Sequence, residues 1–235
     1  MDHMMDNNSL QSDEFLNGLC AYYYLINRNF PEKGTLKLVG DRYRLSGDQR
    51  TILYRGITSE KKASMRKKRL AVNISNQYLL IDGYNVLFTI LNYRLGRITF
   101  ISNDQIVRDA GSLHGKLREE NLFMESLDLL LDYFAEFKPA FVHFYIDSPV
   151  SLSNYHNQII NEKIIRNKLP GICEIVKSPD QCLKKNNEGI IVTSDSVIID
   201  KTDNHIIDVP HLVLKSRFKA RLYDLNKILN KVSHP

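Results

Sequence analysis

The chain has 235 residues, 43% of them hydrophobic, which suits a globular protein with one large domain or a small and a medium one. No apolar run reaches the roughly 18 residues that a membrane span needs, and the polar, acidic residues 1–12 argue against a signal peptide. Three cysteines, at positions 20, 173 and 182, are too few and too scattered for a disulfide framework or a zinc site, so we expect reduced thiols in a cytoplasmic protein.

The net charge of +5 is distributed unevenly along the chain. Residues 1–76 carry 13 basic and 8 acidic side chains, residues 77–214 carry 13 and 18, and residues 215–231 carry 6 and 1. An acidic body between two basic segments suits a metal-dependent enzyme that acts on a polyanion, because carboxylates hold the metal and basic flanks hold phosphates. The alternative is that the basic runs are solvated helix faces.

The first domain, residues 1–58, is expected to be helical. Helices are predicted over residues 13–27, 32–43 and 46–56, the last beginning with a capping-box pattern of Ser46 and Gln49. The second and third helices loosely match a helix-turn-helix, which would place Arg50 and Arg55 on a nucleic acid. A plain three-helix bundle used for packing or dimerisation explains the same residues, so a homodimer stays open.

Residues 59–76 form the strongest local electrostatic signal and predict a basic linker or helix. Its side chains that could hold nucleic-acid phosphates are Lys61, Lys62, Arg66, Lys67, Lys68 and Arg69.

The second domain, residues 77–235, alternates predicted strands with predicted helices, which is typical of a parallel sheet covered on both faces. The strands are predicted at 78–81, 141–146, 172–176, 190–193 and 211–214, and the helices at 84–93, 104–117, 122–137, 155–168 and 215–232. Residues 97–101 predict an additional edge strand or hairpin. The expected fold class is therefore α/β, with a small all-helical domain at the N-terminus.

Aspartates stand where several of these strands end. Asp82, Asp147 and Asp195 each follow an apolar run, and Asp180 precedes a short helical segment. In open α/β sheets, chemistry collects outside the carboxyl ends of the strands. Each aspartate also has a structural interpretation as a helix cap or turn residue. Three strand ends with aspartate favour a cluster, which repels itself unless a cation or a proton sits there.

Two motifs carry a resemblance to a known family. The first is Leu80-Ile81-Asp82-Gly83-Tyr84-Asn85-Val86, and the second is Val192-Thr193-Ser194-Asp195. Both resemble strand ends of the PIN-like nucleases, specifically the NYN branch, over residues 77 to about 215. The whole chain also resembles an uncharacterised prokaryotic family that joins a small helical domain to a PIN-like domain.

The resemblance implies a parallel sheet sandwiched by helices and a ribonuclease that uses Mg²⁺ or Mn²⁺. By position, the implied metal ligands are Asp82, Asp147, Asp180 and Asp195. The implied catalytic residues are Asp82 and Asp195, with Asn85, Thr193 and Ser194 orienting water or phosphate.

The chain departs from the family pattern at the acids, at the insert before Arg108, and after Asp195, where residues 196–200 predict a strand-like run. A single acid, Asp180, stands where the family has an acidic pair, and a short basic segment, residues 181–185, follows it. The insert at residues 97–100 is followed by Arg108 and Asp109, which could add a site element, although Asp104 and Arg108 could simply pair four residues apart.

We therefore expect metal-assisted phosphodiester hydrolysis at the aspartates, with RNA as the partner. Two other classes remain open: a non-catalytic nucleic-acid-binding protein with a degenerate PIN-like domain, and an enzyme that acts on small phosphorylated molecules, since a fold does not fix a substrate.

Overall fold

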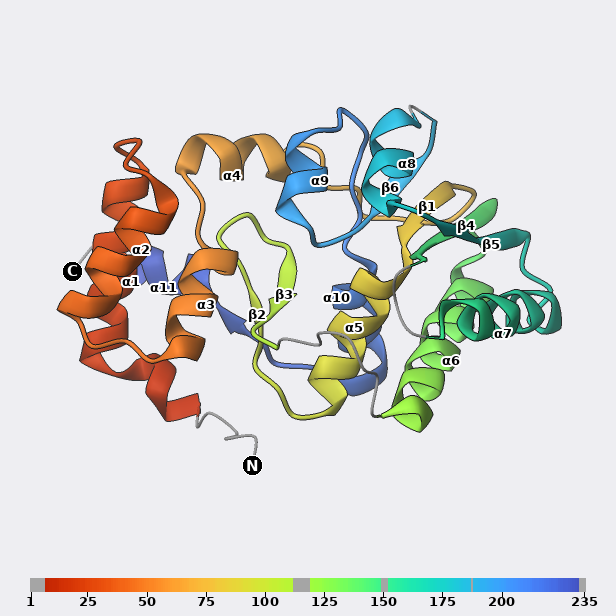
Figure 1. The fold of residues 1–235 in the computed structure, drawn as a ribbon, viewed down its shortest axis with the longest axis horizontal. Helices are drawn as coiled ribbons and strands as arrows, with labels where there is room; N and C mark the ends of the chain where they lie inside the picture. The colour runs from red at the N-terminus through yellow and green to blue at the C-terminus, as the bar shows by residue number, and fades with distance from the viewer. Residues whose placement is uncertain (1–6, 112–118, 149–151, 187, 233–235) are drawn as a thin grey trace. The chain divides into compact units, whose positions relative to one another are not determined.

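The computed structural model describes residues 7–111, 119–148, 152–186 and 188–232. It separates into two compact units (Figure 1). The described part of the first unit comprises residues 7–68, 95–111 and 222–232; that of the second comprises residues 69–94, 119–148, 152–186 and 188–221. None of the described helices combines the length and the apolar character that crossing a membrane requires.

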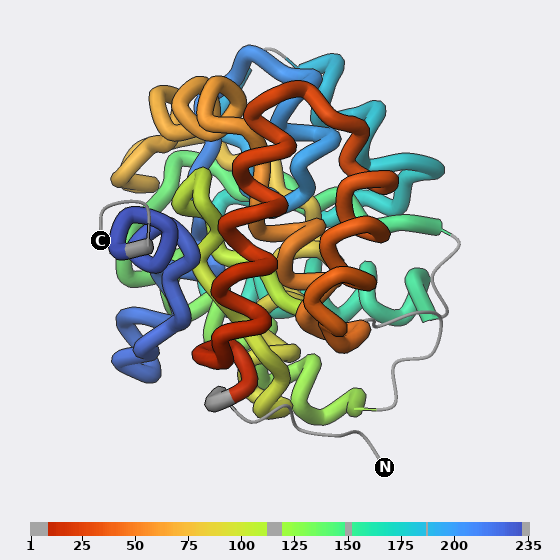
Figure 2. The backbone as a smooth tube through the Cα atoms, turned by 90° about the vertical axis from the view of Figure 1, so that its left-hand side faces the viewer, coloured from red at the N-terminus to blue at the C-terminus, as the bar shows by residue number. Residues whose placement is uncertain are grey.

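The first unit is mainly helical (Figure 2). After a short 3-10 helix, η1 (Asn7–Gln11), come α1 (Asp13–Ile26), α2 (Glu32–Arg42), α3 (Gly47–Gly56), α4 (Glu60–Lys67) and, from the end of the chain, α11 (Leu225–Val232). The predicted capping box of α3 is confirmed, because the Ser46 hydroxyl accepts from the Gln49 N–H and the Gln49 side chain accepts from the Ser46 N–H. The predicted basic linker or helix contains α4.

A small sheet completes the first unit. The predicted hairpin is confirmed as β2 (Thr99–Ile101) and β3 (Val107–Asp109), but β2 is no edge strand, because β7 (Tyr223–Asp224) pairs with it in parallel on its other side. Phe100 and Leu225 are fully buried and join the helices in one hydrophobic core with Phe15 and Leu53. Residues 95–111 and 222–232, which the sequence assigned to the second domain, thus share the core of the first.

The second unit is built on a four-stranded parallel sheet in the order β5-β4-β1-β6 (Figure 1). The strands are β1 (Tyr78–Asp82), β4 (Phe141–Asp147), β5 (Gly171–Val176) and β6 (Ile190–Val192). The chain adds β4 and β5 on one side of β1 and then returns to add β6 on its other side. The strand order therefore reverses between β1 and β6. Single pairings of Ile206 with Ile191 and with Leu70 extend the sheet beyond β6.

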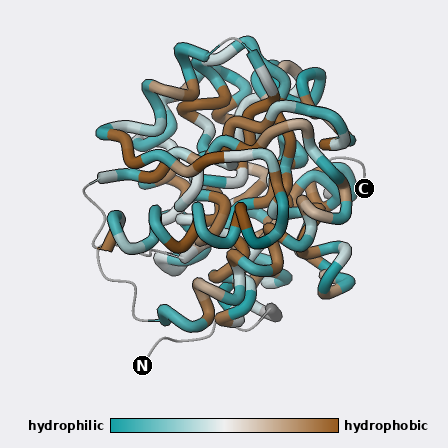
Figure 3. The backbone as a smooth tube through the Cα atoms, turned by 90° about the vertical axis from the view of Figure 1, so that its right-hand side faces the viewer, coloured by the Kyte–Doolittle hydropathy of each residue, from teal (hydrophilic) through white to brown (hydrophobic). Residues whose placement is uncertain are grey.

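The helices flank this sheet unequally. One face packs against α5 (Gly83–Arg94) and α7 (Ser153–Arg166), with α6 (Glu120–Phe137) and α10 (Val209–Phe218) against α5. The other face has the short helices α8 (Pro179–Lys185) and α9 (Ser196–Asp200) and a small core of Leu80, Tyr145, Leu183, Ile191 and Ile198. Figure 3 shows the hydrophobic segments gathered inside and hydrophilic positions along the outer helices. The expectation of a parallel sheet flanked by helices, with a helical region at the N-terminus, is confirmed.

Two sequence predictions in the C-terminal region were wrong. The apolar run His211–Leu214 is not a strand but the middle of α10, which starts at the Asp208 side-chain cap with Pro210 in its first turn. The single helix predicted over 215–232 is broken, because α10 ends where Lys219 adopts a left-handed φ of 50°. β7 and α11 follow, so the basic C-terminal segment is not one helical surface.

A third correction concerns the helix predicted over residues 104–117. Residues 104 and 105 lie in a turn and residues 107–109 form β3, while 112–118 lie outside the described residues. Asp104 is fully buried in this turn and pairs with Arg108 and Arg66, so a contact distant in sequence overrides the local pattern.

Candidate functional site

The predicted aspartates stand at the carboxyl edge of the parallel sheet. Asp82 is the last residue of β1, Asp147 is the last residue of β4, and Asp195 follows β6 by three positions. Because the strand order reverses between β1 and β6, Asp82 and the residues after β6 flank the switch point, where ligands of open α/β sheets bind. The sequence thus located this edge correctly.

Hydrogen bonds join the two predicted motifs across 111 positions of the chain. The Thr193 hydroxyl donates to Asp82 Oδ2 at 2.8 Å. Asn85 Oδ1 accepts from the Ser194 backbone N–H at 2.8 Å and from the Ser194 hydroxyl at 3.0 Å. Since a backbone N–H can only donate, Asn85 must turn its oxygen to Ser194 and its NH₂ group away. That NH₂ group is a donor suited to an anionic ligand.

The Asp82 carboxyl is destabilised in its charged form. Asp82 is only 8% exposed. Burial raises its pKa to about 7, the negative charges of Asp195, Asp147 and Asp180 add to this, and the Thr193 hydrogen bond opposes it. The other three predicted metal ligands therefore all repel a charge on Asp82, and a cation or a proton at Asp82 would relieve the repulsion.

The other three aspartates also have local partners. Asp195 caps α9, accepting from the Val197 N–H at 2.7 Å, so its structural interpretation is confirmed. Asp180 lies in the first turn of α8 and pairs with Lys184 at 3.0 Å. Asp147 is half-buried, and burial together with the charge of Asp180 raises its pKa. These contacts leave Asp82 as the most strongly perturbed member of the group.

Gly83 lets α5 start directly against the neighbouring strand. A Cβ atom there would lie 2.7 Å from Ile146 Cγ2 and 3.0 Å from the Tyr145 carbonyl oxygen of β4. The glycine is therefore required by the close approach of the sheet backbone, which fixes the helix that carries Asn85 beside Asp82.

The oxygen-rich donor set suits a hard divalent cation. Asp82 and Thr193 offer carboxylate and hydroxyl oxygens, the ligand types of Mg²⁺ and Mn²⁺, whereas the Asn85 oxygen is already held by Ser194. Among the residues that the structure describes, no three acidic, histidine or cysteine side chains lie close enough together to hold one ion. Mg²⁺ needs only one or two carboxylates and keeps several waters, so the residues fit an ion held at Asp82, with the other aspartates contributing charge.

The predicted nucleic-acid residues of α3 are engaged within the first unit. Arg50 donates to the Leu45 carbonyl and to Asp41 at 2.9 Å, and its guanidinium lies against Gly40. Arg55 donates to the Asp109 carbonyl at 2.9 Å. Both arginines thus have packing partners, which favours the interpretation of this region as a helical bundle.

The predicted basic segment divides into two kinds of side chain. Arg66 is 4% exposed and pairs with Asp104, which argues against its predicted contact with phosphate. Arg69 donates to the Ile199 and Thr202 carbonyls at the end of α9, which makes it an anchor of that turn. The remaining four, which we call the α4 lysines, are exposed or half-exposed: Lys61, Lys62, Lys67 and Lys68.

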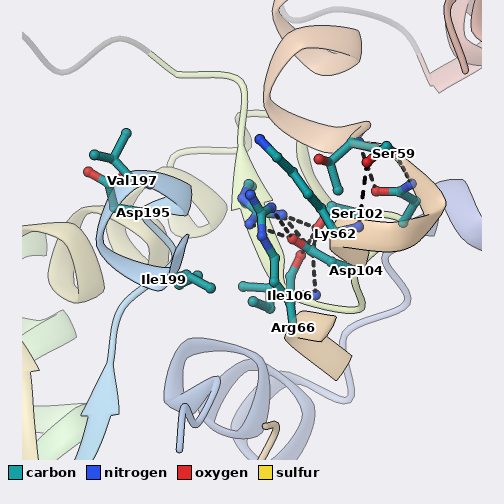
Figure 4. Close-up of polar contacts among 12 residues, drawn as sticks. Ser59, Lys62, Arg66, Ser102, Asp104, Ile106, Asp195, Val197 and Ile199 are labelled. Atoms are coloured by element: carbon teal, nitrogen blue, oxygen red, sulfur yellow. Dashed lines mark hydrogen bonds and ion pairs between the residues drawn. The ribbon is translucent and has the colours of Figure 1, made fainter. Parts of the chain in front are cut away.

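A buried ionic cluster occupies the hairpin of the first unit (Figure 4). The fully buried Asp104 accepts from Arg66 at 2.7 Å and from both terminal nitrogens of Arg108 at 2.7 and 2.9 Å. Although burial disfavours its charge, the two guanidinium groups and the Ser102 hydroxyl hold the pKa of Asp104 well below its ordinary value. The alternative prediction, that Asp104 and Arg108 pair, is confirmed. Asp109 belongs to the same hairpin, in contact with Arg55.

Sequence reasoning missed a hydrogen-bond chain behind α5. The Tyr84 hydroxyl lies 2.9 Å from His156 Nδ1, and His156 Nε2 lies 3.3 Å from Glu120 Oε1. His156 is 1% exposed, and burial lowers its pKa despite the opposing charge of Glu120. The chain ties the first turn of α5 to α6 and α7. No local motif predicts this hydrogen-bond chain, since its three residues span 73 positions of the sequence.

Comparison with known proteins places the chain in a family. A family described as a domain of unknown function (DUF5616) matches residues 71–212, more than half of the chain. The chain belongs to this family. The DUF5616 segment contains all four aspartates, and a second match, to a protein of unknown function (DUF434), covers residues 19–69. Neither description names an activity or a PIN-like domain.

A relative of this DUF5616 member is the uncharacterized protein MJ0935 of Methanocaldococcus jannaschii. The two are 30% identical over 192 residues, which cover 80% of this chain and 90% of the relative. The similarity therefore extends through both matched segments. No solved structure matches the chain significantly.

Proposed function

We propose that this protein is a metal-dependent nuclease that hydrolyses phosphodiester bonds of RNA at the crevice between β1 and β6. The observation that carries the proposal is the buried Asp82 carboxyl at the switch point, raised in pKa to about 7 by burial and by three neighbouring aspartates. An acid whose pKa is strongly perturbed by burial and by specific charged neighbours, at the place where ligands of open α/β sheets bind, is a candidate functional residue. The resemblance to NYN-type nucleases supplies the reaction class and the choice of RNA.

Each residue of the site has a separate proposed role. Asp82 would hold Mg²⁺ or Mn²⁺, with Asp195, Asp147 and Asp180 adding negative charge. The bound ion supplies polarisation of a phosphoryl oxygen and a lowered pKa for water. Thr193 keeps the Asp82 carboxylate in place through its hydroxyl. Asn85, whose oxygen is held by Ser194, presents its NH₂ group to a phosphate oxygen. The α4 lysines would contact backbone phosphates.

The test is cleavage of a labelled single-stranded RNA in Mn²⁺, with and without EDTA. We expect cleavage by the wild type, loss of cleavage in EDTA and in Asp82→Asn, and no loss in Asp132→Asn. Asp132 is an exposed aspartate of α6 in the same unit, so it controls for removal of a charge. Equal cleavage by Asp82→Asn and wild type would reject the assignment.

A second candidate is nucleic-acid binding without catalysis. Two observations favour it: Asp195 is used as a helix cap, and Asp180 is paired with Lys184. Under this alternative, RNA affinity is the same with Mn²⁺ and with EDTA, and no product forms under either condition.

A further inference from the structure

A row of side chains on β4 leads to the aspartates. Side chains alternate along a strand, so Phe141, His143, Tyr145 and Asp147 lie on the same face of the sheet. The register places Tyr78 of β1 beside Phe141. The row runs from the amino end of the sheet to its carboxyl end, a span of about 20 Å at the usual rise per residue of a strand.

Among the described residues, a hydrophobic core covers the carboxyl half of this face. Tyr145 packs there with Leu183 of α8. Towards the amino ends, Tyr78 is 38% and Ile172 is 39% exposed. We call this surface the aromatic face and define it by Tyr78, Phe141, His143, Ile172 and Glu174.

The aromatic face offers flat π surfaces. The rings of Tyr78 and Phe141 are stacked, with centroids 5.0 Å apart and planes 10° from parallel. Gly189 lies close to Tyr78, because a Cβ atom at that position would lie 2.8 Å from the Tyr78 carbonyl oxygen and 3.1 Å from its ring, and its φ is 107°. Bases of every type have a π face, so stacked rings of this kind bind single-stranded nucleic acids without strong sequence preference.

Hydrogen-bonding groups stand beside the rings. His143 Nδ1 lies 3.3 Å from the Tyr78 hydroxyl and 3.1 Å from the Tyr145 hydroxyl, and Nε2 lies 3.0 Å from Glu174 Oε2. Because a carboxylate can only accept, Nε2 donates to Glu174, and Nδ1 accepts from one of the two tyrosine hydroxyls. The Glu174 side chain is 48% exposed, and its carboxylate can accept from the amino group of a base.

One cation, Lys185, ends the short helix α8, which packs on β1 and β4. Lys185 is exposed and can meet a phosphate. Rings, a base-edge acceptor and a cation on one strip fit a nucleic-acid strand better than an apolar protein surface.

We propose that the aromatic face binds the bases of a single-stranded nucleic acid whose backbone continues past the covered carboxyl half of the face to the aspartates at the carboxyl edge. The proposal rests on the proposed function and deepens it, because it makes the substrate single-stranded. A duplex keeps its bases inside the stack and cannot lay them on Tyr78 and Phe141.

The experiment measures binding in EDTA, where no cleavage occurs. Fluorescein-labelled 12-nucleotide RNA is titrated with wild type, Tyr78→Leu, Phe141→Leu and the control Tyr155→Leu, an exposed aromatic of α7. Each face variant is expected to bind roughly 5- to 150-fold more weakly, the factor that corresponds to about 1–3 kcal/mol of stacking per base. The control is expected to bind normally, and the duplex more weakly than the single strand. The salt dependence of the face variants should stay that of the wild type, since no phosphate contact is removed.

Photo-crosslinking of the wild type with a 4-thiouridine 12-mer tests the same surface without relying on variants that could misfold. Crosslinks are expected in peptides containing Tyr78 or Phe141. Wild-type affinity in both face variants, crosslinks confined elsewhere, or equal duplex affinity would overturn the proposal. So would variants that change only the oligomeric state in gel filtration, which would mark a protein interface. RNA cleavage with normal binding by the face variants rejects this inference alone. Loss of binding in those variants, with a wild type that never cleaves, supports it and rejects the nuclease.

Discussion

Asp82→Asn is expected to stabilise the metal-free protein above neutral pH. The ordinary pKa of this carboxyl is 3.8, and burial with the neighbouring aspartates raises it to about 7. Between these values the folded protein holds a proton that the unfolded chain has released, so wild-type stability falls as pH rises. Below pH 4 the group contributes nothing, and above pH 7 its full penalty is present.

The size of the effect follows from the same values. Each pH unit between the two pKa values is worth about 1.4 kcal/mol, which gives a ceiling of about 4 kcal/mol at pH 8. Asparagine carries no charge and its oxygen can still accept from Thr193, so the variant should lose the penalty and keep the hydrogen bond.

The assay is urea unfolding followed by circular dichroism, in EDTA, from pH 4 to pH 8. The difference between Asp82→Asn and wild type should grow with pH, whereas the difference for Asp132→Asn should stay constant. Adding Mg²⁺ at one hundred times its dissociation constant should return about 2.7 kcal/mol to the wild type only. An Asp82→Asn variant that is less stable than wild type at both ends of the range would refute the reasoning and show a structural aspartate.

Three further outcomes follow from the packing and the charges. Gly83→Ala should lower the free energy of unfolding by about 1–3 kcal/mol in thermal unfolding, because its Cβ atom would meet the β4 backbone. Gly34→Ala has open space around it and should not, so equal effects of the two changes would contradict the close approach at Gly83. Asp104→Asn should cost about 3–5 kcal/mol in urea unfolding, since it leaves buried guanidinium groups without their carboxylate, and an unchanged midpoint would count against this. Replacing the α4 lysines by Gln should flatten the salt dependence of RNA affinity by about 0.7 per lost contact on single strands, with Mn²⁺ affinity unchanged; an unaltered slope would make them a solvated face.

The candidate site was accessible from the sequence because its determinants are local. Short apolar runs that end in aspartate predict buried strands, and parallel strands bring their carboxyl ends to one edge. Asp82 and Thr193 could therefore be assigned to the same edge from two separate motifs. Their hydrogen bond and the strand order could not, since both depend on how β6 returns beside β1.

The wrong predictions of secondary structure fall where contacts distant in sequence decide the structure, or where a short apolar run fits both a strand and a helix. Residues 104–109 follow a helical pattern, yet a buried ion pair with Arg66, 38 positions away, holds them in a hairpin. The four-residue run at 211–214 has no decisive periodicity, and the better signal was Asp208 followed by Pro210, a cap and a first-turn proline. The end of α10 had no glycine to announce it, because Lys219 itself takes the left-handed conformation.

The central claim is that Asp82 holds a divalent cation at the switch point of the sheet. It is tested most directly by a crystal structure grown with Mn²⁺ and measured for anomalous scattering. We predict an anomalous peak at coordinating distance from the Asp82 carboxylate, and its loss in Asp82→Asn. A well-ordered Asp82 without a peak, in crystals that hold Mn²⁺ elsewhere, would contradict it.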